Sequence, residues 1–283
     1  MKEVNQIIHL TKSIDVIKSI LVNGFYTSYA NENFEGNNVL IPMISFANIL
    51  FRDIGESEVV NYGKYGIVFD RDDIIDKFEL NPVFYVKNGS EIEKIFSYNF
   101  QTSIIPQALY SAKILSSDDS IKGKFSDYIR INPMSNEVKN LFDSVDKHVN
   151  DSLIESIKKI FEKYYVNTLK QMLLLKPYKI QNKQGEVKIA YNEREWRKSF
   201  TELHYISEYD PKGNLNKAFE FWTKRPKPHY TKEFILDFDR NDIKCIYVEN
   251  EEEVLELKHF VSSTLNMDMD IYTLKALQHS ENM

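Results

Sequence analysis

Apolar and polar positions alternate in ways that predict strands near both ends of the chain and long helices in the middle. The short apolar run from Gln6 to Leu10 predicts a strand. After it, apolar residues recur at helical spacing between Ser13, a suitable N-cap, and Gly24, a suitable stop. Further short runs predict strands at 39–46, 66–69 and 82–86 and a helix at 70–78. The polar stretch 31–38 predicts a loop.

The rest of the chain predicts a helical middle followed by further strands and helices, without an internal repeat. Helical periodicity runs loosely through 90–100 and strongly through 137–175, where it predicts two long amphipathic helices. Two apolar runs on either side of the turn residues 182–185 then predict a β-hairpin. The last predicted elements are a short helix at 216–222, strands at 234–238 and 243–248, and a helix at 251–264. This order predicts one α+β domain over residues 1–283, with a helical insertion at about 90–176.

The composition is that of a folded protein without a membrane span. Aromatic residues make up 13% of the chain, against only 9 glycines and 8 prolines, which is the opposite of a disordered composition. No uncharged apolar run approaches the roughly 20 residues that cross a bilayer, and the N-terminus lacks the apolar core of a signal peptide. One cysteine, Cys245, cannot form an intramolecular disulfide, and its apolar setting predicts a buried thiol rather than a reactive one. We therefore expect a cytoplasmic protein.

Charge and missing motifs narrow the function classes. Acidic residues outnumber basic ones by 42 to 36, for a net charge of -6, which disfavours stable nonspecific nucleic-acid binding but leaves a transient encounter open. The sequence has no phosphate-cradling glycine loop, zinc-ligand spacing or nucleophile elbow. Its six histidines do not stand at metal-ligand spacing, which argues against a metal-dependent hydrolase.

Three short segments remain as carriers of chemistry. The first is residues 7–12, with His9 and Thr11; the second is residues 62–69, with Tyr62 and Tyr65; the third is residues 190–197, with Glu193, Glu195 and Arg197. Each also has a purely structural interpretation. His9 could be a satisfied structural histidine, and the two tyrosines could pack around a tight turn at Gly63 and Gly66. The third segment could be a salt-bridge ladder, with Trp196 in the core, of a kind that contributes about 0–1 kcal/mol when exposed.

Taken together, the three segments resemble the AbiGi family of bacterial abortive-infection, or phage-resistance, proteins. The resemblance spans the chain from His9 to about Val248, with little contribution from the central helices. In that family AbiGi is regarded as the antitoxin partner of a toxin encoded beside it. The resemblance therefore implies a role in phage defence and a protein partner.

The same segments are similar to the ADP-ribosyltransferase fold. Its poly-ADP-ribose polymerase branch has a strand with His-Gly-Thr, a helix ending in Gly-Leu, a Phe-Gly-Lys-Gly-Ile-Tyr segment and a late strand with glutamate, and DNA-modifying relatives such as DarT carry a His-x-Thr. This likeness implies a split β-sheet core with an inserted helical region. It departs from the polymerase pattern at Leu10, in place of the glycine, and at Val68, in place of a stacking tyrosine.

The ADP-ribosyltransferase resemblance assigns a role to each segment. His9 would hydrogen-bond the nicotinamide ribose of NAD with support from Thr11, and Tyr62 or Tyr65 would stack on nicotinamide. Glu195 or Glu193 would stabilise the positive charge that develops on the sugar. Alternation along a strand would place both carboxylates on one face, and the second glutamate of Glu-x-Glu is the catalytic one in arginine-modifying members, which favours Glu195.

The leading hypothesis is thus an anti-phage protein that transfers ADP-ribose from NAD to a macromolecular acceptor, whether protein, RNA or DNA. One alternative is a non-catalytic antitoxin or regulator that keeps the scaffold and binds a toxin partner. A third is an NAD-binding sensor without transfer activity. Since a fold alone does not fix a function, these hypotheses depend on the geometry of the named residues.

Overall fold

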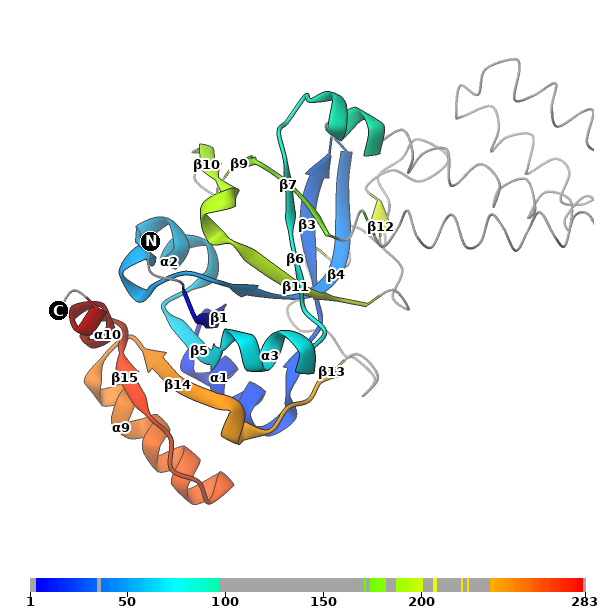
Figure 1. Ribbon diagram of the computed structural model, residues 1–283. Coiled ribbons are helices and arrows are strands. Elements are labelled where there is room, and N and C mark those ends of the chain that lie inside the picture. The colour runs from blue at the N-terminus through cyan, green and yellow to red at the C-terminus, as the bar shows by residue number, and fades with distance from the viewer. Residues whose placement is uncertain are drawn as a thin grey trace, which may run out of the picture.

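The computed structural model describes residues 4–34, 37–96, 174–181, 187–200, 206–207 and 235–281, together with positions 171, 220 and 223. Its centre is a mostly antiparallel sheet, seen in Figure 1, which confirms a fold of mixed α and β structure. The order across the sheet is β15 (Ile271–Thr273), β14 (Ile243–Val248), β5 (Tyr65–Asp70), β1 (Gln6–Thr11), β4 (Asn37–Ala47), β11 (Glu195–Ser199) and β6 (Asn81–Pro82). Two more strands, β3 (Ser28–Phe34) and β12 (Ile206–Ser207), also pair with β4.

Smaller pairs of strands and short helices complete the described part of the chain. The two-stranded pairs are β13 (Ile235–Leu236) with β2 (Phe25–Tyr26), β7 (Phe84–Val86) with β8 (Leu175–Pro177), and β10 (Val187–Ile189) with β9 (Lys179–Gln181). The α-helices are α1 (Ile14–Asn23), α2 (Glu56–Tyr62), α3 (Arg71–Lys77), α9 (Glu251–Phe260) and α10 (Leu274–Glu281). Single turns of 3₁₀-helix lie at Phe51–Asp53 (η1), Ala190–Glu193 (η2) and Arg240–Asp242 (η4), and a π-helical turn, η5 (Val261–Leu265), extends α9.

Helix α1 begins and ends where the sequence predicts. The Ser13 hydroxyl accepts a hydrogen bond from the Val16 N–H, which satisfies one of the free donors of the first turn. At the other end Gly24 has φ 82°, and its N–H donates to the Ile20 carbonyl. A Cβ at Gly24 would lie 2.8 Å from the carbonyl oxygen of Leu236 on β13, so glycine is required both by its positive φ and by the close approach of that strand.

The two faces of the sheet are covered differently. One face, which we call the helical face, carries the largest core, where Phe46, Phe69 and Ile246 pack against α1, α3 and α9. On the opposite face a second cluster lies under α10 and η1, around Val68 and Tyr247. A third cluster, from Val39 to Met43 on β4, is covered by β7 and β8. Between the second and third clusters the sheet is lined by buried polar side chains.

Two predictions of secondary structure need correction. Residues 31–34 and 37–38 were expected in a loop but belong to β3 and β4, which pair with each other, with Asn33 Nδ2 donating to Asn38 Oδ1 at 2.9 Å. Polar side chains suit this strand since they bond across the pair instead of packing into a core. The periodic run was expected to keep Leu175 helical, but this residue belongs to β8, hydrogen-bonded alongside β7.

Much of the predicted helical insertion lies outside the described residues. Of the range 90–176, the structure describes a helical segment at 91–96, position 171 and residues 174–176. The predicted turn at 182–185 and most of the predicted helix at 216–222 also lie outside, whereas the two strands of the hairpin are confirmed as β9 and β10. Within the described residues, none of the helices has the length and apolar character needed to cross a membrane.

Candidate functional site

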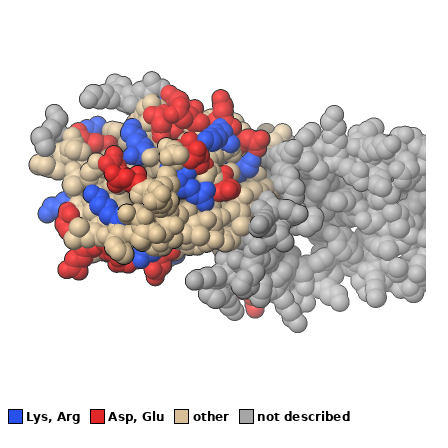
Figure 2. All heavy atoms as spheres, turned by 90° about the horizontal axis from the view of Figure 1, so that it is seen from below, with Lys and Arg blue, Asp and Glu red and all other residues tan. Residues whose placement is uncertain are grey.

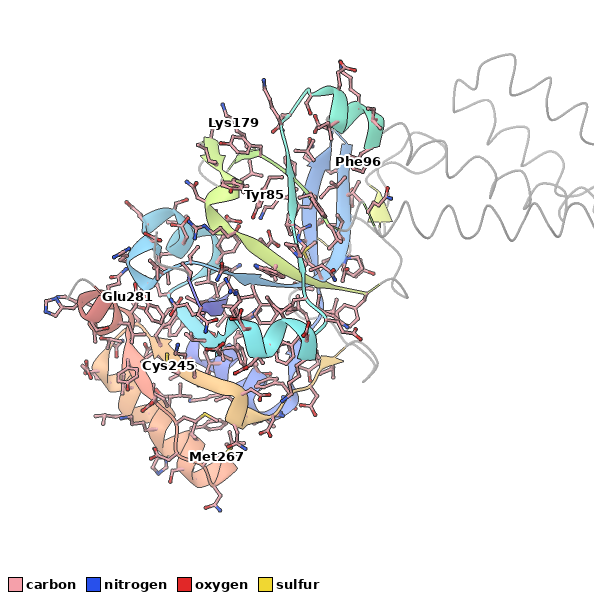
Figure 3. All side chains as sticks on the ribbon, viewed as in Figure 1. Tyr85, Phe96, Lys179, Cys245, Met267 and Glu281 are labelled. Atoms are coloured by element: carbon pink, nitrogen blue, oxygen red, sulfur yellow. The ribbon has the colours of Figure 1, made fainter. Side chains whose placement is uncertain are left out.

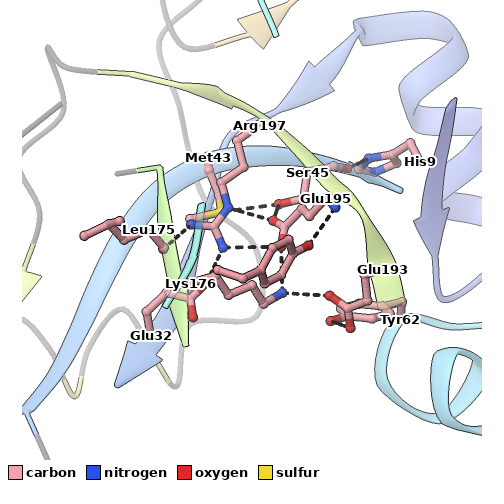
Figure 4. Close-up of polar contacts among 11 residues, drawn as sticks. His9, Glu32, Met43, Ser45, Tyr62, Leu175, Lys176, Glu193, Glu195 and Arg197 are labelled. Atoms are coloured by element: carbon pink, nitrogen blue, oxygen red, sulfur yellow. Dashed lines mark hydrogen bonds and ion pairs between the residues drawn. The ribbon is translucent and has the colours of Figure 1, made fainter. Parts of the chain in front are cut away.

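The polar lining of the sheet is a buried charge cluster built around Arg197. Strand alternation directs Glu195 and Arg197 to one face of β11 and Trp196 to the other, where it packs against the helical-face core as predicted. We define the charge cluster as Glu32, Lys176, Glu193, Glu195 and Arg197, each of which is buried. Figure 4 shows these side chains converging from four segments of the chain.

Arg197 is fully buried and uses its whole guanidinium group. Its Nε donates to Glu195 Oε1 at 2.7 Å, and its Nη1 donates to the Leu175 carbonyl oxygen at 3.1 Å. Its Nη2 forms an ion pair with Glu32, which β3 brings from the edge of the sheet, and lies 3.3 Å from Glu195 Oε2. A planar fork with several fixed donors is the group best suited to such a buried position.

Lys176 is the second cation and is brought to the site by β8. Its Nζ lies 2.6 Å from Glu195 Oε2 and 2.8 Å from Glu193 Oε2, so it bridges the two carboxylates. The other oxygen of Glu195 also accepts a hydrogen bond from Ser45 Oγ at 2.7 Å. Both carboxylate oxygens of Glu195 are therefore engaged by other side chains of the protein (Figure 4).

Glu193 joins the charge cluster from a 3₁₀ turn that the sequence analysis did not predict. It belongs to the 3₁₀ turn η2, and Arg194 after it is left-handed at φ 45°, so the prediction that Glu193 and Glu195 share one face of a strand is wrong. The turn nevertheless aims both carboxylates at Lys176. Tyr62, the last residue of α2, donates its hydroxyl to Glu193 Oε1 at 2.6 Å.

The charges of the cluster stabilise one another. Burial alone would raise the pKa of Glu195, but the opposite charges of Arg197 and Lys176 outweigh it and hold that pKa well below its usual range. In the same way, the carboxylates raise the pKa of Lys176 well above normal in spite of desolvation. At Glu32 desolvation prevails over the attraction of Arg197, and its pKa is raised. The interpretation of residues 193–197 as a salt-bridge ladder is thus correct in that these charges form ion pairs, but the pairs are buried and not exposed.

His9 lies on the other side of the sheet. Its ring packs edge-on against Phe25 and Phe46 in the helical-face core, with centroids 4.8 Å and 5.5 Å away. Its Nδ1 lies 2.9 Å from the Ser45 carbonyl oxygen, so the neutral ring donates to the backbone there. Burial lowers the pKa of His9 to about 4, against the smaller opposing effect of that hydrogen bond. These contacts are those of a satisfied structural histidine.

The remaining predicted residues lie around a surface depression at the end of β1. Thr11 is buried and pairs with Tyr65 across β1 and β5. Tyr65 donates its hydroxyl to Glu253 Oε1 at 2.8 Å and does not contact the charge cluster through any described hydrogen bond. The depression has a volume of about 370 Å³ and is lined by Lys12, Val59, Val60, Gly63, Lys64, Tyr65 and Glu249. Figure 2 shows acidic and basic side chains interspersed on another view of the described surface.

The structure thus brings together only part of the predicted site. Glu193, Glu195 and Tyr62 meet in the charge cluster, while Tyr65 lines the depression, Thr11 pairs with Tyr65 on the neighbouring strand, and His9 lies in the helical-face core. The two departures from the polymerase pattern, Leu10 and Val68, both pack against the cluster under α10. Among the described residues no group of three His, Cys, Asp or Glu side chains is arranged to hold a metal ion.

Sequence reasoning missed four residues of the site, namely Glu32, Ser45, Lys176 and Tyr85. Glu32 and Ser45 stand in stretches without any charge pattern that singles them out. Lys176 offered a weak signal, because it stands between the apolar run 172–175, made of one methionine and three leucines, and Pro177. A lone cation beside such a run must be paired when it is buried. Tyr85 also went unnoticed, although its hydroxyl oxygen accepts the Glu195 N–H at 2.7 Å.

Fold and site together define a mixed α and β protein with a mostly antiparallel sheet and an internally neutralised charge cluster. The profile of a family of abortive phage resistance proteins, AbiGi, described as an antitoxin, matches residues 23–249. The chain belongs to the AbiGi family, which confirms that part of the resemblance and indicates a role in phage resistance. No curated protein and no solved structure matches the chain significantly. The ADP-ribosyltransferase scaffold stays a prediction.

Proposed function

We propose that this chain is the antitoxin of an abortive-infection system and acts by binding a partner toxin protein. The observation that carries the proposal is the match of the AbiGi family, described as an antitoxin, over residues 23–249. The geometry of the strongest catalytic candidate supports it, since both oxygens of Glu195 are engaged by Ser45, Lys176 and Arg197. A carboxylate enclosed in this way has to break internal contacts before it could meet a substrate.

The test is co-expression in a bacterial host. The protein encoded beside this gene is expressed from an inducible promoter, alone or with this chain, and growth is followed. We expect growth arrest by the neighbour alone, rescue by this chain, and co-purification of the two proteins in one complex. Growth arrest by this chain expressed alone, or the absence of any complex or rescue, would contradict the proposal.

ADP-ribose transfer from NAD to a protein, RNA or DNA acceptor is the alternative and makes a different prediction. It requires that Glu195 be freed from the charge cluster when NAD binds, because its oxygens are otherwise occupied. Labelled NAD is incubated with a bacterial lysate and either the wild-type chain or Glu195→Gln. Label that enters a macromolecule only with the wild type supports an enzyme.

The control for that assay separates loss of catalysis from loss of folding. Since Glu195 lies inside an ionic network, Glu195→Gln also lowers stability, so its thermal unfolding is measured beside the wild type. The melting temperature of the wild type is then compared with and without NAD, which stabilises any protein that binds it. No label and no shift with NAD would retire both the transferase and the NAD-sensor hypotheses.

A further inference from the structure

The hairpin of β9 and β10 presents apolar side chains on its outer face. Val187 is 68% exposed and Ile189 39% exposed, and alternation along β10 directs both to the same side. Tyr191, in the turn η2 that follows, is 55% exposed, and its ring contacts those of Tyr85 and Tyr178. Three large apolar residues thus lie close together in sequence on the protein surface. Single exposed apolar residues are common, but a group of them often marks an interaction site.

One edge of the β10 backbone has no strand paired with it among the residues that the structure describes. Ala190 donates its N–H to the Tyr178 carbonyl oxygen, on the side of β9. Because N–H groups alternate in direction along an antiparallel strand, those of Val187 and Ile189 point the other way. Lys179, opposite Ile189, shows the same alternation, since its N–H turns away from β10 and donates to Asn88 Oδ1 at 3.2 Å. Within the described residues, β9 is the only strand paired with β10.

Two exposed lysines lie on the β9 side of the hairpin. Lys179 stands opposite Ile189, which places its exposed side chain on the same face as Val187 and Ile189. Lys87, also exposed, immediately precedes the Asn88 that holds the Lys179 backbone. Neither lysine forms an ion pair with a described carboxylate, whereas Lys18, Lys64 and Lys77 elsewhere on the molecule each do. In a chain with a net charge of -6, this is a locally basic rim.

We propose that β10 is the docking edge for the partner protein, which adds an extended segment to it as a further strand, with apolar side chains over Val187 and Ile189 and acidic ones that reach across β10 toward Lys179. This inference deepens the proposed antitoxin function and rests on it. Strand addition combines main-chain hydrogen bonds with pockets for alternate side chains, and the exposed hairpin offers both. In Figure 1 the hairpin lies at the rim of the described fold, beside β7 and away from α9 and α10, and Figure 3 labels Lys179 there above Tyr85.

A second copy of this chain suits the edge less well. Pairing β10 with itself would place the Lys179 side chains of both copies, with the same charge, on one face of a four-stranded sheet, on its two outer strands. Like charges across an interface disfavour association, and opposite ones favour it. An acidic, apolar strand of a different protein meets the same edge without that repulsion.

The experiment uses the complex of this chain with the protein encoded beside its gene and measures the dissociation constant. Val187→Glu is compared with Leu255→Glu, which places the same charge at a 70% exposed apolar site on α9. Lys179→Glu is compared with Lys258→Glu, an exposed lysine on that helix. We expect each β10-hairpin variant to weaken binding about tenfold or more and each α9 variant to change it less than about twofold.

A second pair of variants separates strand addition from simple apolar contact. Ile189→Ala and Ile189→Pro both remove the large side chain, but only proline removes the N–H that points away from β9. The backbone of Ile189 has φ -85°, close to the value that proline imposes, and its N–H is not part of the ladder with β9. We expect Ile189→Pro to bind about tenfold more weakly than Ile189→Ala, while both unfold at similar temperatures.

The outcomes distinguish the two proposals. If the wild-type chain forms no complex, the antitoxin proposal fails and the docking edge fails with it. If the wild type binds and the hairpin variants bind equally well, only the docking edge is overturned. If the wild type instead forms a homodimer that Val187→Glu dissociates, as sedimentation would show, the edge is an interface between copies and the acidic partner strand is wrong.

Discussion

His9 and Glu195 lie on opposite faces of the central sheet, although each contacts Ser45 between them. The His9 ring meets the Ser45 carbonyl oxygen from the helical face, whereas the Glu195 carboxylate accepts from the Ser45 hydroxyl on the other face. A single substrate in contact with both side chains would have to reach through the strand. The two side chains therefore do not line one site in this arrangement, and the ADP-ribosyltransferase hypothesis requires that one of them has another role than the resemblance assigns.

Because His9 is held neutral in the folded state, it makes stability depend on pH. Its folded pKa of about 4 lies below the ordinary value of roughly 6.5, so the unfolded chain binds more protons between these values. Stability from His9 is therefore fully present above about pH 6.5 and is lost as pH falls toward 4, by on the order of 2–3 kcal/mol.

The measurement is urea unfolding of the wild type and His9→Phe at pH 7 and pH 5. The wild type should lose more free energy of unfolding between the two than the variant, in which the titrating group is absent. Equal losses in both proteins would show that His9 is accessible to protonation in the folded state, contrary to its packing against Phe25 and Phe46.

Removal of Lys176 should be costly because it leaves two carboxylates buried without their shared cation. Lys176→Met keeps the length of the side chain, and Glu193 and Glu195 then lose ion pairs of 2.8 Å and 2.6 Å. We expect a loss of about 3–5 kcal/mol in the free energy of unfolding, as is typical when one partner of a buried pair is removed.

The control is Lys94→Met. Lys94 pairs with Glu91 at 2.8 Å, but both side chains are more than half exposed, so solvent replaces the lost interaction. We expect this variant to unfold at nearly the wild-type urea concentration. If Lys176→Met were equally mild, the charge cluster would be hydrated and not a dry ionic core.

The elements that the sequence predicts well are those whose pattern is local. Strand β1, helix α1 with its Ser13 cap, and strand β14 each follow from apolar spacing or from a capping residue within one short segment. Strand β3 has no such local pattern and was missed, because its own sequence is polar and its stabilising partners lie on β4. Local patterns cannot reveal a strand whose support comes from its neighbour.

The charge cluster could be predicted only in part, because it joins distant segments. Glu195 and Arg197 are neighbours on one strand, so their pairing was expected. The Glu32 that completes the guanidinium contacts is 165 positions away, and nothing in its polar surroundings marks it as buried. Whether a charged residue lies in the core depends on which segments cover it, and only the tertiary structure shows that.

Gly63 is required at the close contact between the end of α2 and β1. A Cβ there would lie 2.0 Å from the Thr11 carbonyl oxygen, and the φ of 110° disfavours any other residue. Gly63→Ala should therefore lose about 3 kcal/mol or more, from backbone strain and overpacking together. Gly89→Ala is the matched control, since its φ of 72° is also positive but a Cβ there meets nothing within 4 Å.

Comparison of the two alanine variants by urea unfolding isolates the steric part of this cost. Gly89→Ala should lose only the conformational part, about 1–2 kcal/mol. A similar loss in both would mean that the chain relaxes at Gly63 without disturbing Thr11. In that case the tight turn predicted for residues 62–66 would be set by φ alone.

Cys245 should be chemically inert in the folded protein. It is buried on β14 beside Val68 and Tyr247, and desolvation raises the pKa of its thiol to about 11. At pH 8 only about one molecule in a thousand then carries the reactive thiolate, and the reagent must also reach a buried atom. Iodoacetamide should therefore label Cys245 slowly in buffer and rapidly in 8 M urea, where the unfolded chain serves as the control. The extent of labelling is followed by mass spectrometry. Fast labelling in buffer would instead restore the hypothesis of a reactive thiol.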